Sequence, residues 1–188
     1  MAYPLLEKFG FIGWFLVPTA FISAPPKQTT KLAKEFSIGF DQKYEDGRIA
    51  LSWNEVRELD RKHVIGCHTH THCRMIASVS EGKMDEEIAQ AKSFLEKEIQ
   101  HEVPIFGWVG GEDFSYSAVA AKKIRDSGYR YAFLTKFAPI RPHTDPFQLH
   151  RGQVDAAWPL EVIKFQLSGV MDVLYTRSRR RTNAITSA

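Results

Sequence analysis

Apolar residues follow two patterns along this chain: continuous runs, and segments in which they recur every three or four positions. Continuous apolar runs predict buried strands at residues 11–17, 63–67, 104–109 and 129–135. Helical spacing predicts helices at residues 30–36, 52–61, 84–99, 117–127 and 159–174. Strands and helices that alternate across short connections are typical of βα units around a parallel sheet or barrel. The pattern therefore predicts an α/β fold.

Length and composition fit a single domain. The chain has 188 residues, of which 44% are hydrophobic, and this is enough for one core and argues against a disordered chain. No apolar run reaches the roughly 18 residues of a membrane span. The nearest run, residues 9–22, follows Glu7 and Lys8 instead of the basic region that a targeting signal needs. We therefore expect a strand there and, by default, a cytoplasmic protein.

The positive charges are concentrated near the C-terminus. The chain carries 25 Lys and Arg against 22 Asp and Glu, and four of the arginines lie at positions 177, 179, 180 and 181. Without those four the chain is nearly neutral, so it lacks the broad basic face of nucleic-acid-binding proteins, and we exclude nucleic acid as a partner. We expect residues 1–175 to form the domain and residues 176–188 to form a flexible Arg-rich tail.

The segment with the clearest chemistry is residues 66–75, GCHTHTHCRM. His68, His70 and His72 alternate directly after a predicted strand, and in parallel βα folds the carboxyl ends of the strands are where site residues gather. His68 and His72 are four positions apart, so in a helical turn both imidazoles project from one side and reach one divalent metal such as zinc. His70 then points away, and we expect it to have a structural role.

Two cysteines flank the histidines and leave a second interpretation open. A closed structural zinc site formed by Cys67, His68, His72 and Cys73 is the alternative, although the segment lacks the Cys-x2-Cys pair that such sites normally contain. Because these are the only two cysteines, a disulfide scaffold is excluded.

Residues 63–72, HVIGCHTHTH, resemble the second motif of the polysaccharide deacetylase family, His-Ser/Thr-x-x-His after a strand. The resemblance continues in order along most of the chain, through residues 3–17, 50–59, 86–99, 128–135 and 149–154. It implies a single-domain, incomplete or distorted (β/α) barrel. It also implies a metal-dependent hydrolase that removes acetyl groups from an N-acetylated or O-acetylated polysaccharide or oligosaccharide.

Members of that family hold their metal with one Asp and two His. The metal polarises the carbonyl of the acetyl group and lowers the pKa of a bound water. A neighbouring Asp acts as base, and a His elsewhere acts as acid. Carried over by position, His68 and His72 are the histidine ligands of a divalent metal, for which we expect zinc.

The chain departs from the family at the first motif, T-F-D-D, which supplies both the base and the Asp ligand. That motif belongs shortly before Tyr3, so both carboxylates are missing from this chain. Glu112 and Asp113 follow a later strand, either as a replacement carboxylate or as solvated loop residues. The resulting alternative is a catalytically inactive member of the family that binds a glycan or a protein partner.

The third motif of the family corresponds to residues 106–111, FGWVGG. Gly107 occupies a position where an Arg is found in the family, and Val109 replaces a Pro. We expect Trp108 to bind substrate, because a flat indole suits the face of a sugar; a role as a core aromatic is the alternative. His150, in the late L-x-R segment, is a candidate for the acid.

Loss of the first strand leaves residues 11–17 as an unpaired hydrophobic edge, which proteins ordinarily cover or charge. We therefore expect either a homodimer through this edge or a longer natural protein in which Met1 is an internal start.

Overall fold

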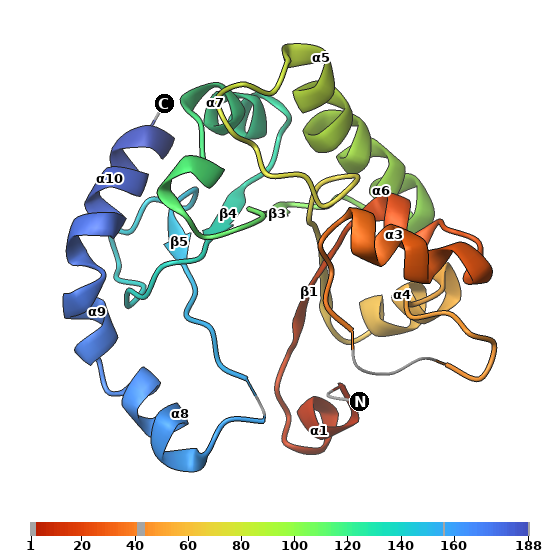
Figure 1. Cartoon of the computed structure of the whole chain (residues 1–188), viewed down its shortest axis with the longest axis horizontal. Helices are drawn as coiled ribbons and strands as arrows, with labels where there is room; N and C mark the ends of the chain where they lie inside the picture. The colour runs from red at the N-terminus through yellow and green to blue at the C-terminus, as the bar shows by residue number, and fades with distance from the viewer. Residues whose placement is uncertain (1–2, 41–43, 156, 188) are drawn as a thin grey trace.

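The computed structural model describes residues 3–40, 44–155 and 157–187. Its five strands form one parallel sheet in sequence order. They are β1 Trp14–Val17, β2 Val64–Cys67, β3 Ile105–Gly107, β4 Tyr131–Leu134 and β5 Leu149–His150. Because each crossover steps to the adjacent strand, the sheet curves with its helices outside the curve (Figure 1). Among the described residues β1 and β5 do not pair, so the predicted incomplete barrel is confirmed.

The helices follow the strands in the expected alternation. They are α1 Tyr3–Lys8, α2 Thr19–Ile22, α3 Thr29–Glu35, α4 Trp53–Asp60, α5 Glu81–Met84, α6 Ala91–Ile99, α7 Ala118–Asp126, α8 Leu160–Leu167, α9 Val170–Leu174 and α10 Thr176–Thr186. A π-helical segment, Asp85–Gln90, joins α5 to α6. None of the helices formed by the described residues combines the length and hydrophobicity of a transmembrane span.

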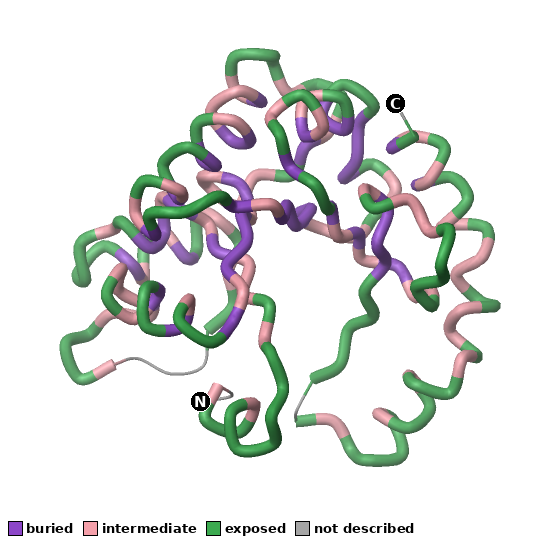
Figure 2. The backbone as a smooth tube through the Cα atoms, turned by 180° about the vertical axis from the view of Figure 1, so that it is seen from behind, coloured by how far each residue is buried: buried purple, intermediate pink, exposed green. Residues whose placement is uncertain are grey.

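The main core lies between the sheet and the helices outside it. Val56 of α4, Leu95 of α6 and Ile124 of α7 are almost fully buried and belong to the same core cluster as Phe106 of β3. Figure 2 shows the buried residues concentrated along the strands and on the helix faces turned toward them. The core therefore fixes the helix layer on the sheet and leaves the carboxyl ends of the strands free to carry loops.

The first strand is shorter than predicted, and most of the run 11–17 is not buried. Phe11 and Ile12 precede β1 and are 66% and 65% exposed, while Trp14 within it is 49% exposed. The physical reason is that β1 pairs with β2 alone among the described residues, so one edge has no covering strand.

The predicted last helix is divided, and its apolar stripe faces solvent. Gly169, with a φ of +86°, ends α8 and begins α9. No residue of α8 is buried, and Leu167 is 70% exposed. The stripe remains uncovered because α8 lies apart from the sheet and packs mainly beside α9 (Figure 1).

Residues 176–186 form helix α10, whereas the sequence predicted a flexible tail. Thr182 and Thr186 are buried where α10 packs near α7. Asp113 accepts hydrogen bonds from Ser178 (2.6 Å) and Arg181 (2.6 Å). The arginine-rich segment is therefore held by a carboxylate distant in sequence, which its composition alone did not reveal.

Candidate metal centre

The rings of His68 and His72 lie together at the carboxyl end of β2. Their centroids are 4.9 Å apart, with the planes inclined by 71°. The segment is a loop, not the helical turn that the four-residue spacing suggested. Thr69 (φ 66°) and His72 (φ 57°) adopt left-handed conformations. These two residues turn the chain so that rings four positions apart meet without a helix.

Hydrogen bonds to the main chain fix the tautomer of both rings. The Nδ1 atom of His68 lies 2.7 Å from the carbonyl oxygen of Gly107, and that of His72 lies 2.8 Å from the carbonyl oxygen of Phe36. A carbonyl oxygen only accepts, so each Nδ1 must carry the proton and donate it. Each Nε2 is therefore left with the free lone pair that a metal needs.

The surroundings keep both imidazoles neutral. Burial lowers the pKa of His68 to about 4, against the opposing effect of its bond to Gly107. Burial likewise lowers the pKa of His72, and the charge of Arg151 lowers the pKa of both rings. At neutral pH both side chains are in the form that ligates a metal.

His70 is held by hydrogen bonds to α2 and to the π-helical segment. Its Nδ1 atom lies 2.7 Å from the hydroxyl of Thr19, and its main-chain N–H donates to Glu87 at 2.8 Å. The main-chain N–H of Ala20 also donates to the carbonyl of His70 at 2.9 Å. This position fits a structural role that ties the histidine loop to α2.

The two carboxylates considered as replacements are engaged elsewhere. Glu112 accepts from Ser115 at 2.7 Å, a bond that lowers its pKa to about 2, and it also pairs with Arg74. Asp113 holds α10 through Ser178 and Arg181. Within the described ranges, no group of three or more His, Cys, Asp or Glu side chains is arranged to hold a metal ion. The imidazoles thus suit zinc in type and protonation, and they form only part of a donor set.

A pocket of about 750 Å³ occupies the same edge of the sheet as the histidines. Its walls come from the segments after β3, β4 and β5 and from α8 and α9. Arg151 lines it and donates to the carbonyl of Trp108 at 3.4 Å. The charge of Arg151 also lowers the pKa of His68 and His72, so the pocket and the histidine pair share one electrostatic environment.

A sequence model of the polysaccharide deacetylase family matches residues 2–132. The chain belongs to the polysaccharide deacetylase family. Comparison with curated protein sequences gives no significant match.

Solved structures share the fold of this deacetylase-family chain. The Streptococcus pyogenes deacetylase PplD, in complex with acetate, superposes with a TM-score of 0.64 at 16% identity, over 90% of this chain and 63% of its own. A de-N-acetylase from Aggregatibacter actinomycetemcomitans gives 0.64 at 15% identity, over 88% and 69%. The BpsB deacetylase domain from Bordetella bronchiseptica gives 0.61 at 13%, over 82% and 65%. The chain thus spans about two thirds of the length of these structures.

The cysteines do not join the histidines in a closed zinc site. Cys67 is fully buried in the core, and burial raises the pKa of its thiol to about 11. It lies opposite Val17 and Phe106 in the sheet, and all three side chains belong to the core on the helix side. Successive strand residues face opposite sides, so His68 points away from the Cys67 thiol.

The prediction that Trp108 lines the groove is wrong. Its side chain is 1% exposed and packs edge-to-face with Phe106 (5.9 Å between centroids) and Tyr116 (5.2 Å). Trp108 follows β3 on the side of the core residue Phe106, while Gly107 between them faces His68. Its indole therefore offers no face to a sugar in this structure.

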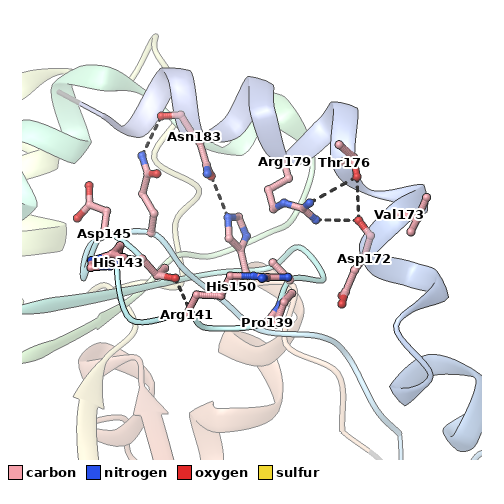
Figure 3. A pocket seen from close by; sticks show the side chains of 13 residues that line it. Pro139, Arg141, His143, Asp145, His150, Asp172, Val173, Thr176, Arg179 and Asn183 are labelled. Carbon is pink, nitrogen blue, oxygen red and sulfur yellow. Dashed lines mark hydrogen bonds between the residues drawn. The ribbon is translucent and has the colours of Figure 1, made fainter.

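His150 contacts helix α10 and not the histidine pair. It is buried at the end of β5, where its Nε2 atom lies 2.8 Å from the side-chain oxygen of Asn183 in α10. Figure 3 shows the ring directed toward Asn183, beside a pocket of about 600 Å³ that Arg141 and Arg179 also line. The structure therefore does not bring this candidate acid together with His68 and His72.

Sequence reasoning missed the aromatic walls of the larger pocket. Trp158 and Tyr175 line it, and both are half-buried. Trp158 lies in an irregular segment, and Tyr175 lies between α9 and α10, where the sequence predicted the end of the domain and the start of a flexible tail. Neither position carried a periodic signal that could have singled it out.

Proposed function

We propose that this chain removes acetyl groups from an acetylated polysaccharide or oligosaccharide, using a divalent metal, zinc, bound through His68 and His72. The observation that carries the proposal is the pair of neighbouring imidazole rings, 4.9 Å apart between centroids, in which each Nδ1 donates to a main-chain carbonyl and each Nε2 keeps its lone pair. Membership of the polysaccharide deacetylase family supports the reaction class.

The roles of the protein groups follow from their positions. When bound, the metal would polarise the acetyl carbonyl and acidify a water. His68 and His72 remain neutral and hold it. Arg151 lines the pocket, and its positive charge, which lowers the pKa of both rings, would stabilise an oxygen that gains negative charge in the reaction.

The pocket of about 750 Å³ supports a glycan as the substrate. Trp158 and Tyr175 supply flat apolar surfaces that suit the faces of sugar rings. Gln153 and Gln166 supply hydrogen-bonding groups for hydroxyls.

Zinc titration and acetate release test this function directly. The wild type should bind zinc and release acetate from an acetylated chitooligosaccharide, and His68→Ala and His72→Ala should each abolish both. His101→Ala is the matched control, because His101 is a surface residue that pairs with Asp60. Zinc binding and activity that persist in both ligand variants would refute the site.

A second function is favoured by the absence of a third metal donor among the described residues. An inactive family member would bind a glycan or a protein partner through the same pocket. The two functions separate when zinc is supplied in excess: the inactive form would bind the oligosaccharide, with Trp158→Ala weakening this binding, and would release no acetate.

We further propose a homodimer that pairs through the free edge of β1. Its support is the exposure of Phe11, Ile12 and Trp14 along and before this edge.

A further inference from the structure

The loop between the two histidines has a backbone that is costly to hold. Thr69 and His72 both have positive φ values, 66° and 57°, and neither is glycine. Non-glycine residues stay in this conformation only when surrounding contacts enforce it. The contacts that enforce this loop are therefore part of what places the two rings.

Glu87 supplies the most concentrated of these contacts. One carboxylate oxygen accepts from the main-chain N–H of His70 and of Thr71, both at 2.8 Å. The other accepts from the hydroxyl of Thr71 at 2.5 Å and pairs with Lys83 at 2.8 Å. The side chain is fully buried, and a buried carboxylate is stable only when it is paired and hydrogen-bonded in this way.

The position of Glu87 in its helix supports a role beyond packing. It lies in the π-helical segment Asp85–Gln90, and π-helical turns occur frequently at functional sites. The two main-chain groups that it binds lie midway between His68 and His72. A carboxylate there fixes the centre of the loop while both rings remain free to face a metal.

We propose that Glu87 is a positioning residue for the histidine pair: its carboxylate clamps residues 70–71 so that the Nε2 atoms of His68 and His72 converge on one point. The inference rests on the proposed metal-binding function. Glu87 itself does not ligate, because both of its oxygens are occupied by the loop and by Lys83.

Two substitutions separate the reach of this side chain from its charge. Glu87→Gln keeps the length, and its amide oxygen still accepts from the N–H groups of His70 and Thr71. Glu87→Asp keeps the charge but is one methylene shorter, so it withdraws from both groups. If Glu87 acts as a clamp, Glu87→Gln should keep its zinc affinity and Glu87→Asp should lose it. If Glu87 acts only through its charge, Glu87→Asp should keep its zinc affinity and Glu87→Gln should lose it.

Zinc affinity, measured by competition with a chromophoric chelator, tests the clamp. We expect Glu87→Gln to remain within about threefold of wild type and Glu87→Asp to bind zinc at least about tenfold more weakly. Glu86→Asp is the matched control, because Glu86 pairs with the same Lys83 at 3.0 Å but has a side chain that is 43% exposed. Equal affinity in wild type and Glu87→Asp, or weaker binding by Glu87→Gln than by Glu87→Asp, would overturn the proposal.

The ring tautomers of the metal-free protein give a second readout that does not depend on zinc. Long-range ¹H–¹⁵N spectra should show His68 and His72 protonated at Nδ1 in wild type and in Glu87→Gln, and as mixed tautomers in Glu87→Asp. If wild type takes up no zinc, the proposed function fails, while these spectra still decide the role of Glu87. If Glu87→Asp does not fold, Thr71→Val, which removes one donor to the carboxylate, should show the same change in the ring spectra, and an unchanged spectrum would overturn the clamp.

Discussion

The side chain of Leu16 lies directly over Gly107, at the point where Gly107 supports His68. A Cβ atom added to Gly107 would stand 2.2 Å from Cδ1 of Leu16 and 3.2 Å from Nδ1 of His68. The absence of a side chain at Gly107 thus leaves room for the Leu16 side chain of β1 to extend past β2 and lie against β3, while the Gly107 carbonyl accepts from His68. Close packing against Leu16 therefore explains a glycine at this position, where the family resemblance places an Arg.

Gly107→Ala should therefore weaken the site and the fold together. Leu16 must move, and overpacking of this kind costs about 1–3 kcal/mol of unfolding free energy. We also expect weaker zinc binding, because the carbonyl that orients His68 shifts. Chemical denaturation and zinc titration measure the two effects.

Gly82→Ala is the control for that substitution. Gly82 lies in α5, and a Cβ atom added there would meet only open space, so alanine should stabilise the protein by up to about 1 kcal/mol and leave zinc binding unchanged. A neutral result for Gly107→Ala in both measurements would show that the close approach of Leu16 is not maintained in solution.

Asp113 should control the protection of α10 against trypsin. Four arginines lie in this helix, and Asp113 receives bonds from Ser178 and Arg181. We expect slow cleavage at these arginines in the wild type and cleavage about tenfold faster in Asp113→Ala, because the helix detaches more often. Mass spectrometry of the fragments locates the cuts.

The matched control for Asp113 is Asp126→Ala. Asp126 also forms an ion pair, with Lys122, but on the exposed face of α7. Cleavage in α10 should be unchanged in this variant. Rapid cleavage of the wild type at the same arginines would favour the flexible tail that the sequence predicts.

The sequence predicted the architecture because local signals and burial agree in the helix layer. Ser52 and Glu55 form a capping box at the start of α4, and Val56 and Leu59, which the helical spacing places on one face, are buried. The apolar stripe of α8 followed the same rule and failed, since burial needs a partner surface that no local pattern can supply.

The sequence predicted that His68 and His72 lie together, but not the backbone geometry that brings them together. The spacing of His68 and His72 indicated that both rings could bind one metal ion. The loop brings them together through the left-handed conformations of Thr69 and His72 instead of the expected helical turn. Glu87 carried no signal, because its role depends on a contact with a loop 16 and 17 positions away. Trp108 is buried because it follows Gly107. Gly107 faces His68, so the next side chain points to the opposite side, into the core.

The free edge of β1 predicts self-association. Phe11→Lys combined with Ile12→Lys places charge beside this edge and should convert a dimer to a monomer, because a like-charged edge resists pairing. Light scattering coupled to size-exclusion chromatography measures the mass. Leu167→Lys in α8, a comparably exposed residue outside β1, should leave the mass unchanged. A wild type that is monomeric at high micromolar concentration would contradict the dimer.

Acid should destabilise the fold through the contact between Arg48 and Glu55. Hydrogen bonds from Arg48 (2.5 and 3.1 Å) lower the pKa of Glu55 to about 2, with a further contribution from Ser52 and against the opposing effect of burial. The pKa is lower in the folded than in the unfolded state, so the folded state is favoured above pH 4.5 and loses this contribution as the pH falls from 4.5 to 2. Because the group is partly exposed, the loss is on the order of 1–2 kcal/mol.

Glu55→Gln should have lower stability at pH 7 and a flatter acid profile, whereas Glu58→Gln, on the exposed side of the same helix, should follow the wild type. Denaturation midpoints between pH 7 and pH 2 measure this difference, and parallel profiles for Glu55→Gln and wild type would exclude Glu55 as the group that titrates.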